Sequence, residues 1–145
     1  MDFMKEALME ARKALMLDEV PVGAIIVKDN KIISRAHNLR ETLNSPLAHA
    51  EVLAIKDASE KLNSWRLTGC KLYVTLEPCI MCAGAIAQAR ISEVYIGTID
   101  PAAGACGSIL NILQNDNLNL HTKTHWLYNE ECSQLLKDFF KWKRK

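Results

Sequence analysis

The sequence has 145 residues, of which 49% are hydrophobic and 24% charged, so it can fold as one domain around a continuous apolar core. Its 18 basic and 17 acidic residues leave a formal net charge of +1, which excludes a uniformly basic nucleic-acid-binding chain and a highly charged disordered chain. No apolar run approaches the roughly 20 residues that span a bilayer. Five cysteines without a disulfide framework favour free thiols or a metal site. We therefore expect a single cytoplasmic domain over residues 1–145, without a membrane partner.

The N-terminal part is predicted to contain a helix, a β-hairpin and a second helix. Apolar residues recur at helical spacing over about Asp2–Leu17. Two β-branched runs, residues 22–27 and 32–33, flank an Asp-Asn pair and indicate a hairpin. The polar stretch His37–Pro46 predicts a loop, and the next helix is expected over about Ala48–Leu62.

The remainder of the chain alternates strands and helices. Pro78 lies at a position where a helix can begin, because proline is tolerated in the first helical turn. The elements expected are a strand at Lys71–Leu76, a helix at Cys79–Arg90, a strand at Val94–Gly97, a short helix near Ser108–Leu113, a strand around Thr122–Leu127 and a last helix from about Glu130. This alternation predicts an α/β layer sandwich around a largely parallel sheet.

Two cysteines and a histidine are candidate metal ligands. Cys79 and Cys82 are three positions apart at a helix start, so both sulfurs face one side, where the helix dipole favours thiolates. Together with His49 they form a three-ligand set for zinc, which leaves a position for water, as in catalytic zinc sites. Zinc lowers the pKa of such a water to about 7 and so supplies hydroxide near neutral pH.

A carboxylate beside this set completes a hydrolytic site. Glu51, two residues beyond His49, can reach the same cavity and move protons without binding the metal. The combination predicts hydrolytic deamination of an aminopurine or aminopyrimidine ring. Two alternatives stay open: a thiol-redox module with a Cys-x-x-Cys pair, which leaves the His-x-Glu motif unexplained, and a closed structural zinc site. The cysteines that could complete a closed site are Cys70, Cys106 and Cys132.

The C-terminal end combines charge with aromatic rings. The final nine residues contain five basic side chains, one acidic side chain and three aromatic rings. Aromatic rings and cations can stack bases and hold phosphates, whereas an amphipathic helix would instead pack its rings on the core. Since a short RNA stem-loop needs only a basic patch, the near-neutral net charge does not exclude an RNA partner.

The His-x-Glu and Pro-Cys-x-x-Cys motifs resemble those of the zinc-dependent nucleotide deaminases, most closely the bacterial enzymes that act on tRNA adenosine. The segments that carry the resemblance are Glu19–Ala24, Ala36–Asn38, Pro46–Glu51, Ser64–Leu67, Leu72–Gly84, Asp100, Gly107–Ser108 and Phe139–Phe140. The resemblance implies a three-layer α/β/α sandwich of the cytidine deaminase type, with a central mixed five-stranded sheet and helices on both faces. It also implies hydrolysis of adenosine to inosine at wobble position 34 of a tRNA anticodon.

Site roles follow from the same resemblance. It implies one zinc ion per chain on His49, Cys79 and Cys82, with Glu51 as the proton shuttle. The residues expected at the flipped base and its neighbouring nucleotides are Asn38, Val22 and Asp100. The residues expected along the anticodon stem-loop are Phe140, Arg144 and Arg66. The implied partners are a tRNA, first of all an arginine tRNA, and a second copy of the chain. A zinc deaminase of free guanine, cytosine or a nucleoside is the alternative.

Overall fold

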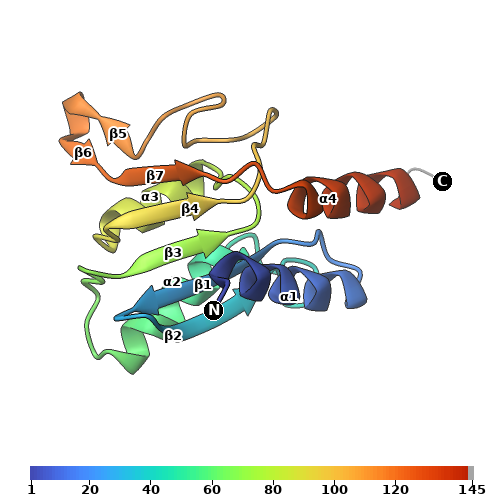
Figure 1. Ribbon diagram of the computed structural model, residues 1–145, viewed down its shortest axis with the longest axis horizontal. Helices are drawn as coiled ribbons and strands as arrows, with labels where there is room; N and C mark the ends of the chain where they lie inside the picture. Colours follow the sequence, from blue (N-terminus) through green and yellow to red (C-terminus); the bar gives the residue numbers. More distant parts are fainter. Residues whose placement is uncertain (144–145) are drawn as a thin grey trace.

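A five-stranded sheet forms the centre of the computed structural model, which describes residues 1–143 (Figure 1). In spatial order its strands are β2 (Lys31–His37), β1 (Gly23–Lys28), β3 (Lys71–Val74), β4 (Glu93–Ile96) and β7 (Lys123–Trp126). Strand β1 is antiparallel to both β2 and β3, whereas β3 pairs with β4, and β4 with β7, in parallel. The sheet is therefore mixed. The expectation of a largely parallel sheet is wrong, because the N-terminal hairpin inserts β1 antiparallel to its neighbours.

Helices cover both faces of this sheet (Figure 1). Helices α2 (Ala50–Lys61) and α3 (Ile80–Gln88) lie on one face, and α1 (Phe3–Met16) lies on the other. Helix α4 (Glu130–Lys143) runs beside α1. An ion pair of 2.9 Å joins the two helices, and a second of 2.6 Å joins α4 to the turn after α1. This arrangement confirms the three-layer α/β/α sandwich with a mixed five-stranded sheet. No helix within residues 1–143 is long and apolar enough to cross a bilayer.

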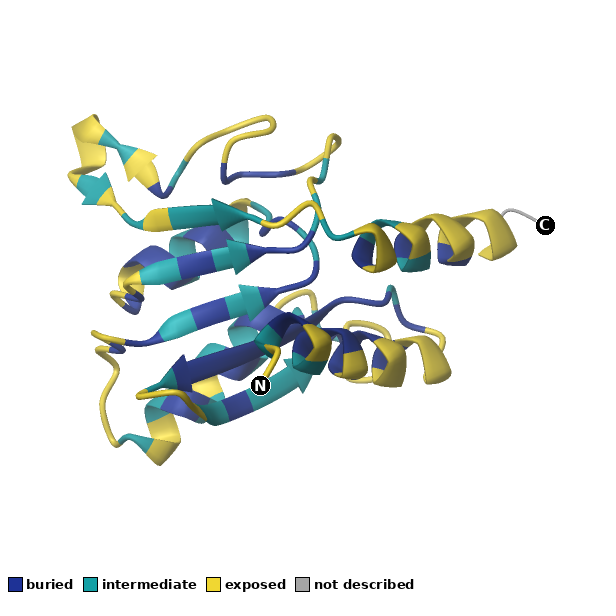
Figure 2. Cartoon of the chain, in the orientation of Figure 1, coloured by how far each residue is buried: buried dark blue, intermediate teal, exposed yellow. Residues whose placement is uncertain are grey.

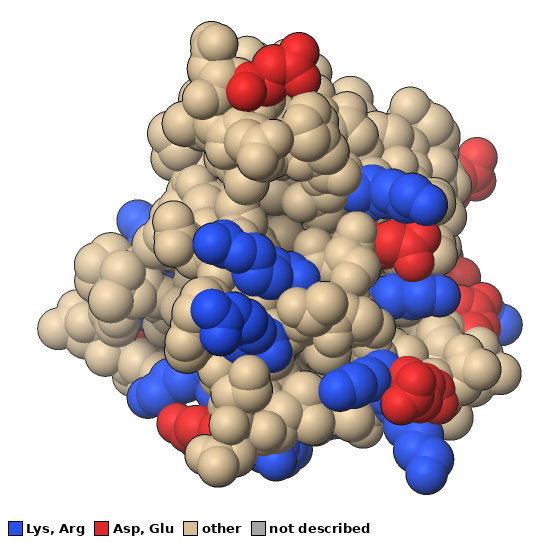
Figure 3. Space-filling model, turned by 90° about the vertical axis from the view of Figure 1, so that its left-hand side faces the viewer, with Lys and Arg blue, Asp and Glu red and all other residues tan. Residues whose placement is uncertain are grey.

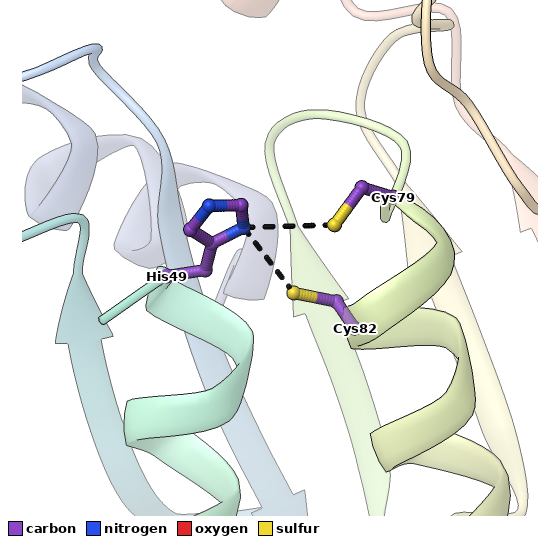
Figure 4. A group of neighbouring side chains, drawn as sticks. All are labelled: His49, Cys79 and Cys82. Atoms are coloured by element: carbon purple, nitrogen blue, oxygen red, sulfur yellow. Dashed lines mark hydrogen bonds between the residues drawn. The ribbon is translucent and has the colours of Figure 1, made fainter. Parts of the chain in front are cut away.

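Small side chains on the helices bring them close to the sheet. Ala50, Ala54 and Ala58 of α2 are fully buried, and they pack in one cluster with apolar residues of β1, β3 and β4. Figure 2 shows the buried residues concentrated along the strands and the inward helix faces. Since α2 and α3 both begin at the same end of the sheet, their N-termini lie next to each other (Figure 4).

The predicted N-terminal elements are confirmed with shifted boundaries. The hairpin turn places Asp29 and Asn30 at positive φ, 50° and 61°, as a two-residue turn between right-twisted strands requires. The helix after β3 begins one residue later than expected. Cys79 is its N-cap with an extended backbone, so Pro78 precedes the helix rather than opening it.

The prediction of a short helix near Ser108–Leu113 is wrong. This stretch forms turns and an isolated bridge between Cys106 and Asn111. The backbone N–H of Ser108 donates to the Glu77 carboxylate, and the next two N–H groups donate to the carbonyl of Gly104. None of these donors binds the carbonyl four residues earlier, as it would in an α-helix. The elements that follow, which the sequence patterns did not predict, are β5 (Gln114–Asn115), η1 (Asp116–Leu118) and β6 (Leu120–His121).

Candidate active site

A pocket of about 760 Å³ opens at the end of the sheet where α2 and α3 begin. Its volume falls in the range of about 300–1,000 Å³ that is typical of small-molecule and cofactor sites. The predicted site residues among its lining are Val22, Asn38, His49, Glu51, Cys79, Asp100 and Phe140. Helix ends supply the pocket floor, and the loops after β2 and β4, together with α4, supply its walls.

The structure brings His49, Cys79 and Cys82 together at the pocket floor (Figure 4). The Nδ1 atom of His49 lies 3.6 Å from Sγ of Cys79 and 3.5 Å from Sγ of Cys82. His49 is the N-cap of α2 and Cys79 the N-cap of α3, yet neither side chain caps its own helix. Both side chains instead face the space between the two helices, where the positive ends of two helix dipoles favour thiolate.

The donor set fits a zinc ion. A tetrahedral zinc with Zn–N of about 2.1 Å and Zn–S of about 2.3 Å holds nitrogen and sulfur about 3.6 Å apart, which matches the observed spacing. The three ligand atoms lie within 4.8 Å of one another, and no other His, Cys, Asp or Glu of residues 1–143 joins the group. Three ligands without a fourth leave a coordination position open for water or substrate.

The other three cysteines do not complete a closed site. Cys70, Cys106 and Cys132 are buried apart from the cluster, among apolar neighbours. Burial raises the pKa of Cys106 and of Cys132 to about 12, so both stay protonated and unreactive near neutral pH. In contrast, hydrogen bonds with Cys82 and His49 lower the pKa of Cys79 to about 3. The hydrogen bond with Cys79 raises the pKa of Cys82, so within this pair Cys79 has thiolate character and Cys82 keeps its proton. A metal ion that binds both sulfurs would displace that proton.

Glu51 lies beside the cluster, in the first turn of α2. It lines the pocket and is only 4% exposed. Burial raises the pKa of Glu51 to about 7, against 4.5 for an ordinary glutamate. A carboxyl group that titrates near neutral pH can both accept and return a proton, which is the requirement for an acid–base shuttle.

Val22 and Asn38 lie together on one wall of the pocket. Both are nearly buried, at 8% and 7% exposed. The amide of Asn38 donates to the carbonyl of Val20 at 3.2 Å, and its oxygen accepts the N–H of Arg40 at 3.1 Å. One N–H and one lone pair of this amide remain free, because an asparagine side chain has two donors and two acceptor sites. Asn38 thus fastens its own loop and still has hydrogen-bonding capacity toward the pocket.

The remaining predicted residues differ in their placement. Asp100 lines the opposite wall, where its carboxylate accepts the N–H groups of the two residues after Pro101 at 3.0 Å and 3.2 Å. Phe140 of α4 lines the pocket rim and is 45% exposed. Arg66 lies outside the pocket lining, in the connection after α2, with its guanidinium 4.3 Å from the ring centre of Trp65. Arg144 lies outside the described residues.

Two buried glutamates of the walls were missed by sequence reasoning. Glu19 is 1% exposed and accepts the N–H groups of Glu41 at 3.0 Å and Thr42 at 2.6 Å. Burial alone would raise the pKa of Glu19, but these bonds outweigh it and hold the pKa below 4.5. Glu77, 2% exposed, holds the other wall. The available signal was an acidic residue next to an apolar segment: Glu19 directly precedes Val20–Val22, and Glu77 directly follows Leu76.

The sandwich fold, the open His-Cys-Cys cluster and the neighbouring buried glutamate together define the class of zinc-dependent deaminases. The sequence profile of the MafB19-like deaminases matches residues 1–144. The tRNA-specific adenosine deaminase of Aquifex aeolicus is 52% identical over 96% of this chain and 92% of its own length. The enzyme of the same name from Bacillus subtilis is 47% identical, over 99% and 89%.

Among solved structures, one from a study of A-to-I editing by tRNA:A34 deaminases at the wobble position is 43% identical. Its TM-score is 0.89, and the match covers 92% of this chain and 98% of the other. The chain belongs to the MafB19-like deaminase family, and its expected kinship with the tRNA-specific adenosine deaminases is confirmed.

Proposed function

We propose that this protein hydrolyses adenosine to inosine at the wobble position of a tRNA anticodon and releases ammonia. The observation that carries the proposal is the open three-ligand cluster of His49, Cys79 and Cys82 beside the buried carboxyl group of Glu51. The relatives named above are enzymes with this activity by name. In this proposal residues 1–145 form a single deaminase domain that acts in the cytoplasm.

One zinc ion per chain would be held by Nδ1 of His49 and the sulfurs of Cys79 and Cys82. When bound there, zinc supplies a hydroxide nucleophile near neutral pH. Glu51 moves the protons: it takes one from the attacking water, gives it to the ring nitrogen beside the attacked carbon, and then assists protonation of the leaving amino group. The C–O bond at C6 of adenine forms first and the exocyclic C–N bond then breaks, so adenosine and water give inosine and ammonia.

The walls are suited to a base that has been flipped out of the anticodon. Val22 offers an apolar surface to the ring, and Asn38 offers its free amide N–H and lone pair to the polar edge of the base. Asp100 stands on the opposite wall, near neighbouring nucleotides. Phe140 at the rim presents a half-exposed ring on which a flanking base can stack.

The partner we propose is a tRNA anticodon stem-loop, with an arginine tRNA as the first to test. We also propose that the protein works as a homodimer. Two basic side chains, Lys143 at the end of α4 and Arg40 after β2, line the pocket, and Lys143 forms an ion pair of 2.6 Å with Asp18. Arg144 extends the basic sequence of this end. The face of the molecule away from α4 shows acidic and basic side chains intermixed (Figure 3), so it lacks a continuous basic surface for RNA. We assign binding to the pocket end because the residues proposed to hold the base line the pocket there, and Arg66 remains a candidate outside it.

The decisive experiment incubates the zinc-loaded protein with an anticodon stem-loop that contains adenosine 34 and measures inosine. We expect inosine from the wild type and a decrease in kcat of about 10²- to 10⁴-fold for Glu51→Ala, with zinc content unchanged, because the substitution removes only the proton shuttle. Glu60→Ala is the matched control, since this exposed glutamate lies on the same helix.

Three results would contradict the proposal. The first is a zinc-loaded wild type that forms no inosine. The second is release of ammonia from free guanine or cytosine without reaction on the stem-loop, which would indicate a free-base deaminase. The third is full activity of Glu51→Ala together with reversible oxidation of Cys79 and Cys82, which would indicate a thiol-redox module.

A further inference from the structure

We infer that Glu77 is a positioning residue for substrate binding: it fixes the wall loop, residues 100–108, against the turn that carries Cys79. The inference rests on the proposed function, since it concerns how that pocket holds its RNA. Two residues of the wall loop, Asp100 and Ala103, line the pocket opposite Asn38. The position of this loop therefore sets the width available to a bound nucleotide.

The Glu77 side chain is completely engaged by the wall loop. Its Oε1 accepts the N–H of Asp100 at 3.0 Å and the hydroxyl of Ser108. Its Oε2 accepts the N–H groups of Cys106 and Ser108, both at 3.0 Å. These four donors fill the roughly four acceptor sites of a carboxylate. Glu77 thus binds three separate positions of one irregular loop with a single side chain.

This saturation separates Glu77 from the proton shuttle. An acid–base residue needs a free lone pair for the proton that it carries, and Glu77 has none left while the loop is in place. Glu51 lies in the same pocket and has a pKa raised by burial, as expected for a poorly compensated carboxyl group. Glu77 consequently acts through the loop and not on the reacting atoms.

The backbone strengthens the same connection. The N–H of Glu77 donates to the carbonyl of Thr98, and the N–H of Ala105 donates to the carbonyl of Pro78, both at 2.9 Å. At Gly104 the loop passes so close that a Cβ atom would clash with the Glu77 carboxylate. Residues 77–78 thus contact the loop at its start, at positions 104–106 and at its end. The wall can hold one position without any regular secondary structure.

Loss of this carboxylate should loosen the wall and leave the chemistry intact. The ligands and Glu51 lie at the N-terminal ends of α2 and α3, whereas the four donors to Glu77 all belong to the wall loop. A mobile wall loop binds the extruded nucleotide less well, because part of the binding free energy is then used to order the loop. The effect is therefore expected in KM and in the dissociation constant for RNA, with kcat much less changed.

The test compares Glu77→Gln with Glu93→Gln, a carboxylate of β4 that contacts His125 and lies outside the pocket lining. Glutamine keeps the shape but directs an NH₂ group at loop donors. For Glu77→Gln we expect KM for the adenosine-34 stem-loop to rise at least tenfold, kcat to stay within threefold, and zinc content to stay at one per chain. Glu93→Gln should leave all three unchanged.

Two milder variants keep the inference testable if Glu77→Gln does not fold. Ser108→Ala removes one of the four donors and should raise KM about two- to threefold. Gly104→Ala leaves the carboxylate intact but pushes the loop away from it, and should raise KM at least fivefold. If KM rises for both variants and zinc is retained, substitutions in the loop itself support the positioning role of Glu77.

Three outcomes overturn the inference. If the variants lower only the melting temperature and leave KM and kcat unchanged, Glu77 is merely structural. If zinc is lost, Glu77 supports the metal turn instead of the wall. If kcat falls and KM does not, Glu77 acts on the chemistry.

Stem-loop binding can also be measured by fluorescence anisotropy in a Glu51→Ala background, where the substrate is not turned over. This measurement detects a change in the wall loop through RNA affinity alone. A wild type that forms no inosine would refute the proposed activity, whereas the anisotropy comparison would still decide the role of Glu77.

Discussion

The floor and the walls of the pocket are held in place by different kinds of interaction. At the floor, His49, Cys79 and Cys82 lie at the N-termini of two regular helices that pack on the sheet. The walls are irregular loops, and each is fastened to the body by one buried carboxylate, Glu19 or Glu77. The residues assigned to chemistry therefore lie on rigid elements, while the residues assigned to substrate contact depend on a few long-range hydrogen bonds.

Electrostatics follow the same division. Glu51 at the floor and Glu19 in a wall are almost equally buried, at 4% and 1% exposed. Burial raises the pKa of Glu51 to about 7, whereas two backbone N–H donors overcome burial at Glu19 and lower its pKa. The hydrogen-bond donors around a buried glutamate thus decide whether its carboxyl group titrates near neutral pH or stays ionised there.

Removal of the metal should have the largest effect and should separate the floor from the walls. Chelation followed by dialysis is expected to reduce inosine formation to background, and stoichiometric zinc should restore it, because no other ligand set in residues 1–143 can hold the ion. Stem-loop binding by the metal-free protein should change less than threefold, since the wall loops are fastened by hydrogen bonds to Glu19 and Glu77, which are not metal ligands. Loss of both activity and RNA binding on chelation would contradict this separation.

The same division explains what the sequence predicted. The pocket floor could be predicted from local sequence patterns. Apolar periodicity locates α2 and α3, and the Cys-x-x-Cys spacing puts both sulfurs at a helix start. The resemblance to deaminases added Val22, Asn38, Asp100 and Phe140, and all four line the pocket. Local patterns thus located the cluster at the two helix starts, and the resemblance located four further residues of the pocket lining.

The pocket walls could not be predicted from local sequence patterns. Residues 108–113 were expected to be helical, but donors from this stretch bind Glu77, 31 positions earlier in the chain. The sheet direction was also misjudged, since helical alternation favours parallel strands and cannot show that β1 lies antiparallel to β3. Such pairings depend on contacts between distant residues, which the periodicity of a single sequence does not contain.

The second prediction concerns Glu19 and the wall that it fastens. Glu19→Gln should lower the free energy of unfolding by about 1.5–3 kcal/mol at pH 7, the usual contribution of hydrogen bonds to a charged group. Because the folded-state pKa of Glu19 lies below its ordinary value of 4.5, its stabilisation is complete above pH 4.5 and is lost as the pH falls through the folded-state pKa. Urea unfolding should therefore show the difference between variant and wild type shrinking below pH 4.5. The exposed Glu41→Gln is the control, and a difference that persists at low pH would argue against an ionised Glu19.

The third prediction concerns the pocket rim. Phe140→Ala should raise KM for the stem-loop at least fivefold with little change in kcat, because stacking of a base on an aromatic ring contributes about 1–3 kcal/mol. The neighbouring Trp142→Ala is the comparison: this ring is 60% exposed but does not line the pocket. An equal effect of the two substitutions would mean that the whole helix surface binds RNA and that the rim has no special role.

The smallest effect is expected at Arg66. This side chain lies beyond the C-terminal end of α2, whereas His49 lies at its N-terminal end, and a 12-residue helix is about 18 Å long. Its guanidinium stacks on Trp65, and the face of the molecule away from α4 carries charges of both signs (Figure 3). If the stem-loop contacts only the pocket end, Arg66→Ala changes KM less than twofold on a stem-loop and on full-length tRNA alike. If Arg66 binds a more distant part of the tRNA, KM rises for the full-length substrate alone, with the salt dependence of a lost phosphate contact. The paired substrates therefore decide whether recognition ends at the pocket or continues along the helices.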